Sequence, residues 1–191
     1  IEITTGICKN VEEARSDLSK TLCDVIEYSK SCNLELVSMA THPFATWKDQ
    51  SVTQNERYIQ FLDRMRYPLR RLIITGLHVH IGVESGEKAI AITNGLLRYI
   101  PMFIAISSNS PFFEGQNTGL ASTRTKIFEG LPTAGLPPYL RNFSEFQRFM
   151  RTLQRAKTIQ SIREVWWDIR PHPGFGTVEI RVCDAVPTLG Q

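Results

Sequence analysis

Three short segments alternate apolar and ionisable residues, and this alternation constrains the fold more than any other feature of the chain. The segments are GLHVHIG (76–82), WWDIR (166–170) and TVEIRV (177–182). Side chains two positions apart in a β-strand point to the same face of the sheet. Each segment therefore predicts a strand with one apolar face and one face that carries a pair of ionisable groups. The pairs are His78 with His80, Asp168 with Arg170, and Glu179 with Arg181.

Two interpretations fit these ionisable faces. A sheet with one face in solvent gives the same alternation, and that is the simpler interpretation. Ordinary exposed faces are rich in lysine, threonine, serine and glutamate, whereas these three pairs contain no lysine. We therefore favour a pocket lined by histidine, arginine and acidic side chains, with helices behind the apolar face.

Helical spacing of apolar residues predicts helices over 10–31, 55–72, 86–106 and 145–159, and apolar runs predict strands over 33–40, 165–170 and 177–183. We expect Asn10 with Glu13, and Ser144 with Gln147, to cap two of the helices. Pro68 predicts a kink or a split in the second helix. Residues 107–139 read as one long loop. This mixed order favours an α+β domain over a doubly wound sheet.

Composition narrows the class of partner. The net charge of +3 over 191 residues is too small to favour nucleic acid or an anionic membrane surface. The longest apolar stretch, Tyr99–Ile106, is interrupted by Pro101 and is short for a membrane span. The four cysteines lack CxxC spacing, which is typical of reduced thiols in a cytoplasmic protein. We expect no nucleic-acid partner, no membrane partner and a cytoplasmic location.

The residue types on the ionisable faces favour phosphoryl chemistry. Histidine and carboxylate ligands together suit a divalent ion such as Mg²⁺ or Mn²⁺. Arginine pairs bidentately with carboxylate or phosphate, so an anionic substrate is expected. The chain has no Walker A sequence, so a nucleotide would bind at the sheet face. Arg124, in GLASTR (119–124), is a further candidate for ligand contact, with a solvated loop arginine as the alternative.

Several motifs in order resemble one known family. They are THPF (41–44), NERY (55–58), GLHVHIGV (76–83), SSNSPFFEGQNTGLASTR (107–124) and WWDIRPHPGFGTVEIRVCD (166–184). Together they resemble the carboxylate–amine ligases, also called glutamate–cysteine ligase type 2. The resemblance implies a glutamine synthetase-like fold, which is a curved, mostly antiparallel sheet with helices on one face and an active-site cleft on the other.

The resemblance also implies roles for individual residues. His78, Glu179 and Glu2 match metal ligands, and His80 would lie beside them near the nucleotide. Arg181 matches an arginine that contacts the substrate or the transferred phosphoryl group. Arg124 matches a loop arginine that meets the acidic substrate or the γ-phosphate. For Asp168 and Arg170 we expect a structural ion pair.

The implied reaction is ATP-dependent joining of glutamate to an amine, such as that of cysteine, through an acyl phosphate, with Mg²⁺ or Mn²⁺. In the family, a strand with a G-x-E-x-E-type glutamate pair would precede Ile1, and a helical portion would follow Gln191. We therefore expect residues 1–191 to be a single catalytic-core fragment, inactive alone, with homo-oligomerisation possible through an open sheet edge. The sequence does not identify the amine.

Two other functions fit the residues. The first is a non-catalytic binding module that keeps the ligase-like fold. The second is a metal-dependent hydrolase using His78, His80 and Glu179, although HxH alone is a weak zinc signal. We interpret His42 as a structural loop residue and His172 as a turn residue.

Overall fold

The computed structural model describes residues 2–52 and 54–190, and its contacts divide the chain into two compact units. One unit combines Ile1–Ser38 with Val186–Gln191, and the other is Met39–Ala185. The expectation that all 191 residues form a single catalytic-core fragment stays a prediction.

The first unit is built on one long helix, α1 (Val11–Ser31). The Asn10 side chain accepts a hydrogen bond from the Glu13 backbone N–H at 2.9 Å, which satisfies a free donor of the first turn. Acidic residues lie in the first turn and Lys30 in the last, an order that suits the helix dipole. The predicted helix over 10–31 and its cap are confirmed.

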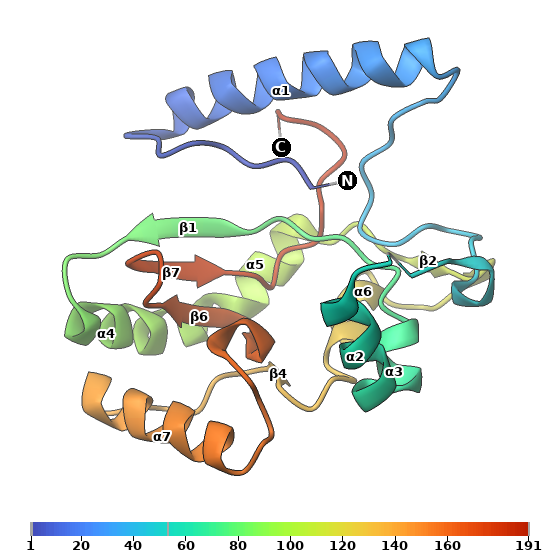
Figure 1. Ribbon diagram of the computed structural model, residues 1–191. Helices are drawn as coiled ribbons and strands as arrows, with labels where there is room; N and C mark the ends of the chain where they lie inside the picture. The colour runs from blue at the N-terminus through green and yellow to red at the C-terminus, as the bar shows by residue number, and fades with distance from the viewer. Residues whose placement is uncertain (1, 53, 191) are drawn as a thin grey trace. The chain divides into compact units, whose positions relative to one another are not determined.

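The second unit contains a three-stranded antiparallel sheet with the order β1 (Val79–Gly82), β7 (Thr177–Ile180) and β6 (Ile169–His172), shown in Figure 1. The alternation therefore predicts the sheet correctly. The strand predicted over 165–170 is broken at Asp168. Its first part, β5 (Trp166–Trp167), pairs in parallel with β4 (Ala134–Gly135) instead of joining the sheet.

The apolar face of β6 and β7 packs against a helical layer. Ala89 of α4 (Gly86–Leu96) and Ile100 of α5 (Ile100–Ser107) are buried in one cluster with Ile169 and Val178. A short 3₁₀ turn, η2 (Leu97–Tyr99), joins the two helices. The helix predicted over 86–106 is confirmed, and it lies behind the sheet, as the apolar face requires.

The helical stretch Gly86–Ser107 has 22 residues and, in length and composition alone, is able to cross a membrane. Pro101 does not interrupt it, because proline lies in the first turn of α5, where a missing N–H costs no helical hydrogen bond. A helix in the core of a protein has the same length and composition, so this stretch by itself does not indicate a membrane span. The expectation of no membrane partner stays a prediction.

A second core lies under α7 (Phe143–Arg155), where Phe146, Ile90 and Trp167 are buried together. The helix begins after Asn142, whose side chain accepts from the Glu145 N–H at 2.9 Å. The predicted helix is therefore confirmed, but the predicted cap pair Ser144 and Gln147 is wrong.

The predicted split of the helix over 55–72 is confirmed, since it divides into α2 (Glu56–Met65) and α3 (Tyr67–Arg70), with Pro68 in the first turn of α3. The break itself falls at Arg66, which has a positive φ of 54°.

Two further predictions need correction. Segment 33–40 forms no strand in the described chain, and the residue after it, Thr41, makes an isolated bridge with Ile74. A strand without a hydrogen-bonded neighbour is not stable.

The predicted loop 107–139 contains regular structure. A hairpin of β2 (Phe112–Phe113) and β3 (Gln116–Asn117) turns through two residues with positive φ, Glu114 at 50° and Gly115 at 79°. This conformation is the turn that two-residue hairpins favour. The hairpin is followed by α6 (Thr123–Phe128), and two more 3₁₀ turns, η1 (Trp47–Asp49) and η3 (Ile162–Glu164), complete the unit. The protein is thus an α+β protein, as the sequence predicts.

Candidate active site

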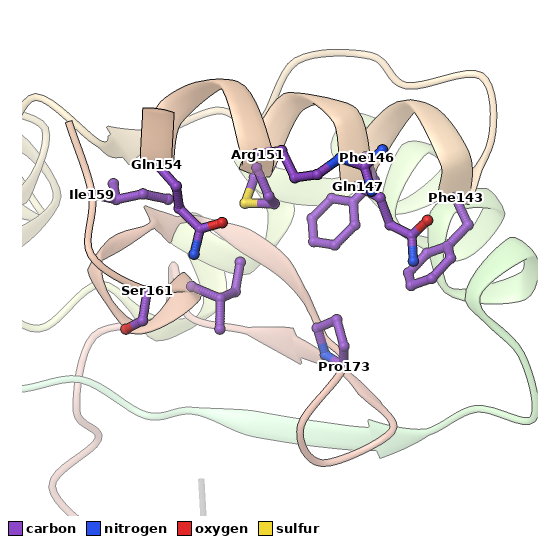
Figure 2. Close-up of a pocket in the computed structure, with 10 residues that line it drawn as sticks. Phe143, Phe146, Gln147, Arg151, Gln154, Ile159, Ser161 and Pro173 are labelled. Atoms are coloured by element: carbon purple, nitrogen blue, oxygen red, sulfur yellow. The ribbon is translucent and has the colours of Figure 1, made fainter. Parts of the chain in front are cut away.

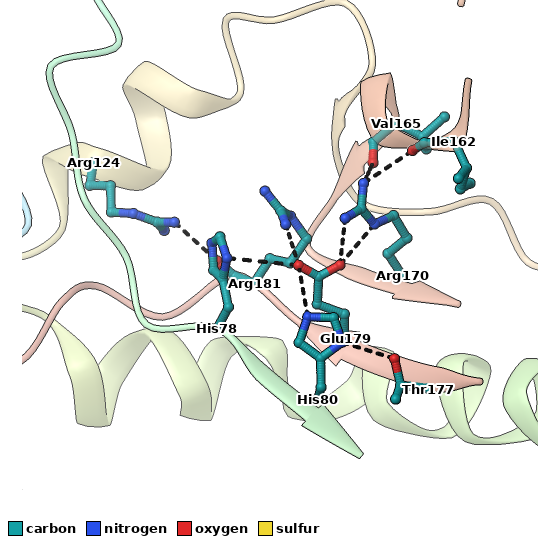
Figure 3. A network of polar contacts seen from close by, with 9 residues as sticks. All are labelled: His78, His80, Arg124, Ile162, Val165, Arg170, Thr177, Glu179 and Arg181. Carbon is teal, nitrogen blue, oxygen red and sulfur yellow. Dashed lines mark hydrogen bonds and ion pairs between the residues drawn. The ribbon is translucent and has the colours of Figure 1, made fainter. Parts of the chain in front are cut away.

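The register of the sheet brings ionisable residues of all three strands into one row. Glu179 in the central strand β7 lies opposite His80 of β1 on one side and Arg170 of β6 on the other. Figure 3 shows these side chains gathered with His78 and Arg181 around the Glu179 carboxylate. We call His78, His80, Arg170, Glu179 and Arg181 the polar cluster.

Glu179 is the centre of the polar cluster and is only 2% exposed. One carboxylate oxygen accepts two hydrogen bonds from Arg170, from Nε at 2.9 Å and Nη2 at 2.6 Å. The other accepts from Nη1 of Arg181. Burial raises the pKa of Glu179, but the attraction of Arg181 and Arg170 outweighs burial, so the pKa lies below its ordinary value. Glu179 is therefore a buried carboxylate that stays ionised.

The two histidines lie at the more open side of this carboxylate. His78 Nδ1 is 3.7 Å and His80 Nε2 is 3.5 Å from the same Glu179 oxygen. His80 Nδ1 lies 2.8 Å from the Thr177 hydroxyl, which fixes the ring. Burial and then the charge of Arg181 lower the pKa of His78 to about 3, against the opposing effect of Glu179. His78 is therefore neutral, with a lone pair that is able to bind a cation.

Arg170 joins the polar cluster to the chain before β6. Its Nη1 donates to the carbonyls of Ile162 at 3.1 Å and Val165 at 2.7 Å, while its other nitrogens bond Glu179. The structural role predicted for Arg170 fits these contacts, but its partner is Glu179. The expected ion pair between Asp168 and Arg170 is wrong, because alternation gives the face of a residue and not its partner.

Arg124 is not a solvated loop arginine. It is 3% exposed, at the start of α6, and its terminal nitrogens donate to the carbonyls of Val182 at 3.1 Å and Arg181 at 3.0 Å. It lies close enough to His78 to lower the pKa of that histidine further. The predicted contact of Arg124 with a substrate or nucleotide stays a prediction.

Glu2 lies in the first unit and is exposed. The polar cluster belongs to the second unit, so the assignment of Glu2 as a metal ligand stays a prediction.

Two residues beside the site escape the sequence analysis. His172 is not a turn residue but the last residue of β6, 7% exposed, with its ring stacked on Phe175 at 4.3 Å and 6.0 Å from the ring of His80. Burial and then Arg170 lower its pKa. Continuing the alternation from Asp168 through Arg170 places His172 on the ionisable face, so the sequence pattern could have predicted its position beside the site.

Asp184 is the second such residue, and it connects the 107–124 segment to the chain that follows β7. It is 1% exposed and accepts from the Asn109 N–H at 2.9 Å, the Ser110 hydroxyl at 2.7 Å and the Ser122 hydroxyl at 2.9 Å. These bonds connect segments more than 60 residues apart, so no local pattern predicts them.

The described residues supply only part of a metal site. His78 and Glu179 are a neutral imidazole and an ionised carboxylate that face one point, which suits two ligands of a divalent ion. Among the residues that the structure describes, however, no group of three His, Cys, Asp or Glu is arranged to hold a metal. His78 and Glu179 thus suit a divalent metal ion, but they would supply only two of its ligands.

A separate hollow of about 410 Å³ runs along α7 (Figure 2). Phe143, Phe146, Ile159 and Pro173 line it, and no residue of the polar cluster does. It is a surface groove beside the second core and does not extend the candidate active site.

Comparison with known proteins identifies the family. The model of glutamate–cysteine ligase family 2 matches residues 1–191. A protein named "Putative glutamate--cysteine ligase 2" from Thermobifida fusca is 48% identical over 191 residues, all of this chain and 48% of the relative. "Putative glutamate--cysteine ligase 2-1" from Frankia casuarinae is 48% identical over 189 residues, 99% of this chain and 50% of the relative.

A third relative, "Putative glutamate--cysteine ligase 2" from Gloeobacter violaceus, is 44% identical over 191 residues, all of this chain and 51% of the relative. The chain therefore spans about half the length of the curated relatives it matches. The match over every residue, together with the polar cluster on one sheet face, shows that the chain belongs to glutamate–cysteine ligase family 2.

Proposed function

We propose that the natural full-length protein is an ATP-dependent carboxylate–amine ligase that joins the γ-carboxylate of glutamate to an amine such as cysteine. The observation that supports this most is the polar cluster, in which arginines outnumber carboxylates. Such a cluster attracts anionic groups, and glutamate and ATP are both anions. Family membership supports ligase chemistry in general, and the cytoplasmic location is part of the proposal.

In the proposed reaction, an oxygen of the glutamate γ-carboxylate attacks the γ-phosphorus of ATP, and the bond to ADP breaks. The amine nitrogen then attacks the acyl carbon, inorganic phosphate leaves, and the nitrogen loses a proton. Both reactants of the first step are anions, so their repulsion is the main barrier. Arg181 lies beside the sheet face where it would neutralise that charge.

In this proposal, other residues of the polar cluster bind the metal ion or lie near the nucleotide. His78 and Glu179, with Glu2, would hold Mg²⁺ or Mn²⁺, which when bound supplies charge neutralisation for the phosphates. His80, fixed by Thr177, would lie near the nucleotide. A glutamine synthetase-like cleft over this sheet face completes the proposal.

The test is phosphate release in the natural full-length protein, measured with and without ATP, Mg²⁺, glutamate and each of a panel of amines, cysteine first. We expect release to need all four components. His78→Ala is expected to lower it at least about 100-fold. The matched control is His42→Ala, since His42 is exposed and hydrogen-bonds only its own loop through the N–H groups of Phe44 and Ala45. A folded protein that releases no phosphate with any acid and amine would contradict the ligase.

One observation favours a second function. Among the described residues, no group of three His, Cys, Asp or Glu is arranged to hold a metal, so the polar cluster also suits a binding module that keeps the fold without catalysis. Calorimetric titration with ATP and with glutamate separates the two functions. Binding without turnover supports the module, and turnover excludes it.

A further inference from the structure

The guanidinium of Arg124 is committed to the main chain. Its Nη1 and Nη2 donate to the carbonyls of Val182 and Arg181, at 3.1 Å and 3.0 Å. The Arg124 backbone N–H donates to the Ser110 hydroxyl at 3.1 Å, so the residue itself is fixed at the start of α6. One buried side chain therefore joins α6 to the chain that leaves β7.

The space for this guanidinium exists because residue 76 is glycine. A Cβ on Gly76 would lie 2.2 Å from Nη2 of Arg124, 2.6 Å from Cζ and 2.8 Å from Nε. The backbone of Gly76 is not free to retreat, since it forms a bridge with Asp184 and the next residue, Leu77, donates to the Cys183 carbonyl at 3.1 Å. Gly76 is required for space.

Arg181 depends on this arrangement. It follows the last residue of β7, so no strand neighbour holds it in the three-stranded ladder. Its backbone N–H donates to the Asp168 carbonyl at 2.8 Å, and its own carbonyl accepts from Arg124. From this fixed backbone its side chain reaches Glu179, as Figure 3 shows.

We infer that Arg124 and Gly76 form a positioning pair: the guanidinium of Arg124 occupies the space left by Gly76 and holds the Arg181 backbone so that its side chain is aimed into the polar cluster. Arg124 thus acts through Arg181 and does not contact the substrate. Lysine cannot replace it, because one ammonium group lacks the planar fork that reaches two carbonyls. The kinetic consequences of this inference rest on the proposed function.

The main test is Gly76→Ala, which displaces the guanidinium without changing any charged residue. We expect kcat for phosphate release to fall about 10- to 100-fold, because displacement of a reacting-site group by about 1 Å has such an effect. The KM values for ATP and glutamate are expected to stay within about twofold, since no contact with either is removed. Arg124→Lys is expected to give the same pattern, and the double variant no further loss.

Gly95→Ala is the matched control, because a Cβ on Gly95 in α4 meets no atom within 4 Å. It is expected to leave kcat unchanged. A second readout does not need activity: nuclear magnetic resonance of the Arg181 guanidinium nitrogens reports whether their rotation is hindered. We expect hindered rotation in the natural protein and in Gly95→Ala, and free rotation in Gly76→Ala and Arg124→Lys.

Two results would overturn the inference. In the first, Arg124→Lys raises the KM for ATP or glutamate more than about tenfold, while Gly76→Ala leaves kcat and the Arg181 signal unchanged. This is the pattern expected if Arg124 contacts the substrate directly. If Gly76→Ala does not fold, the double variant Gly76→Ala with Arg124→Ala is expected to fold, because the methyl group of Ala then has room. The second contradicting result is that this double variant also fails to fold. If the natural protein shows no turnover, the proposed function fails and the resonance signal alone decides the inference.

Discussion

At the scale of single residues, the polar cluster depends on the charge of Glu179. Two buried arginines use it as their common anion: Arg170 lies 2.6 Å from one carboxylate oxygen, and Arg181 pairs with the other. Removing the charge of Glu179 would leave Arg170 and Arg181 charged and buried without a counter-ion. Most of the loss in folding stability would come from these unpaired charges.

We predict that Glu179→Gln lowers the free energy of unfolding by about 3 kcal/mol, because Arg170 and Arg181 lose their counter-charge in a buried site. Urea denaturation measures the change. Glu84→Gln is the matched control, since Glu84 pairs with Lys88 on the exposed surface. The control is expected to change stability little. Equal effects of the two substitutions would mean that the buried pairs do not stabilise the fold.

Asp168 gives a pH-dependent prediction. It is 4% exposed, and burial followed by repulsion from Glu129 raises its pKa from 3.8 to about 6. The positively charged groups that oppose this shift are Arg124, Lys126 and Arg181. Since the pKa of Asp168 is higher in the folded than in the unfolded protein, folding favours the protonated acid. The stability that Asp168 contributes is therefore present below pH 4 and lost as the pH rises through about 6.

Asp168→Asn removes this dependence. The stability of the natural protein relative to the variant is therefore expected to fall between pH 4 and pH 7, by at most about 3 kcal/mol. The Asp168 carbonyl that bonds Arg181 is unchanged in the variant. Thermal unfolding of both proteins across this range measures the difference. A difference that is constant with pH would show that Asp168 titrates at its ordinary value.

At the scale of elements, the start of α7 tests how local chemistry and packing compete. Asn142 with Glu145 and Ser144 with Gln147 are both acceptable cap pairs, and the structure uses Asn142. We predict that Asn142→Ala lowers the free energy of unfolding by about 1 kcal/mol, since the Glu145 N–H loses its partner. Ser144→Ala, a matched change two residues on, is expected to have almost no effect. The reverse order would contradict the observed cap.

The sequence predicts elements well where the decisive interactions are local. Alternation with a period of two fixes which face each side chain takes, so the ionisable face of the sheet follows from it. The break of the third predicted strand at Asp168 does not follow from it. The register between strands is not local, so the pairing of Arg170 with Glu179 does not follow. The start of α7 is also set by packing that is not visible in the local pattern. Phe143 stacks on Phe146 at 5.6 Å in the second core, so α7 begins at Phe143, before the predicted cap residue Ser144.

At the scale of the whole molecule, half of each curated relative has no counterpart in these 191 residues. The polar cluster provides two arginines, an ionised carboxylate and a neutral histidine, all of which belong to the second unit. The activity itself is therefore a property to be measured in the natural full-length protein.

The proposed ligase reaction requires that the glutamate γ-carboxylate attacks ATP. The most direct measurement supplies glutamate with ¹⁸O in its γ-carboxylate, together with ATP, Mg²⁺ and the amine, and determines the isotope content of the phosphate by mass spectrometry. We expect one ¹⁸O atom in each phosphate released, because the attacking oxygen leaves with the phosphorus. Phosphate released without ¹⁸O would show that the γ-carboxylate does not attack ATP.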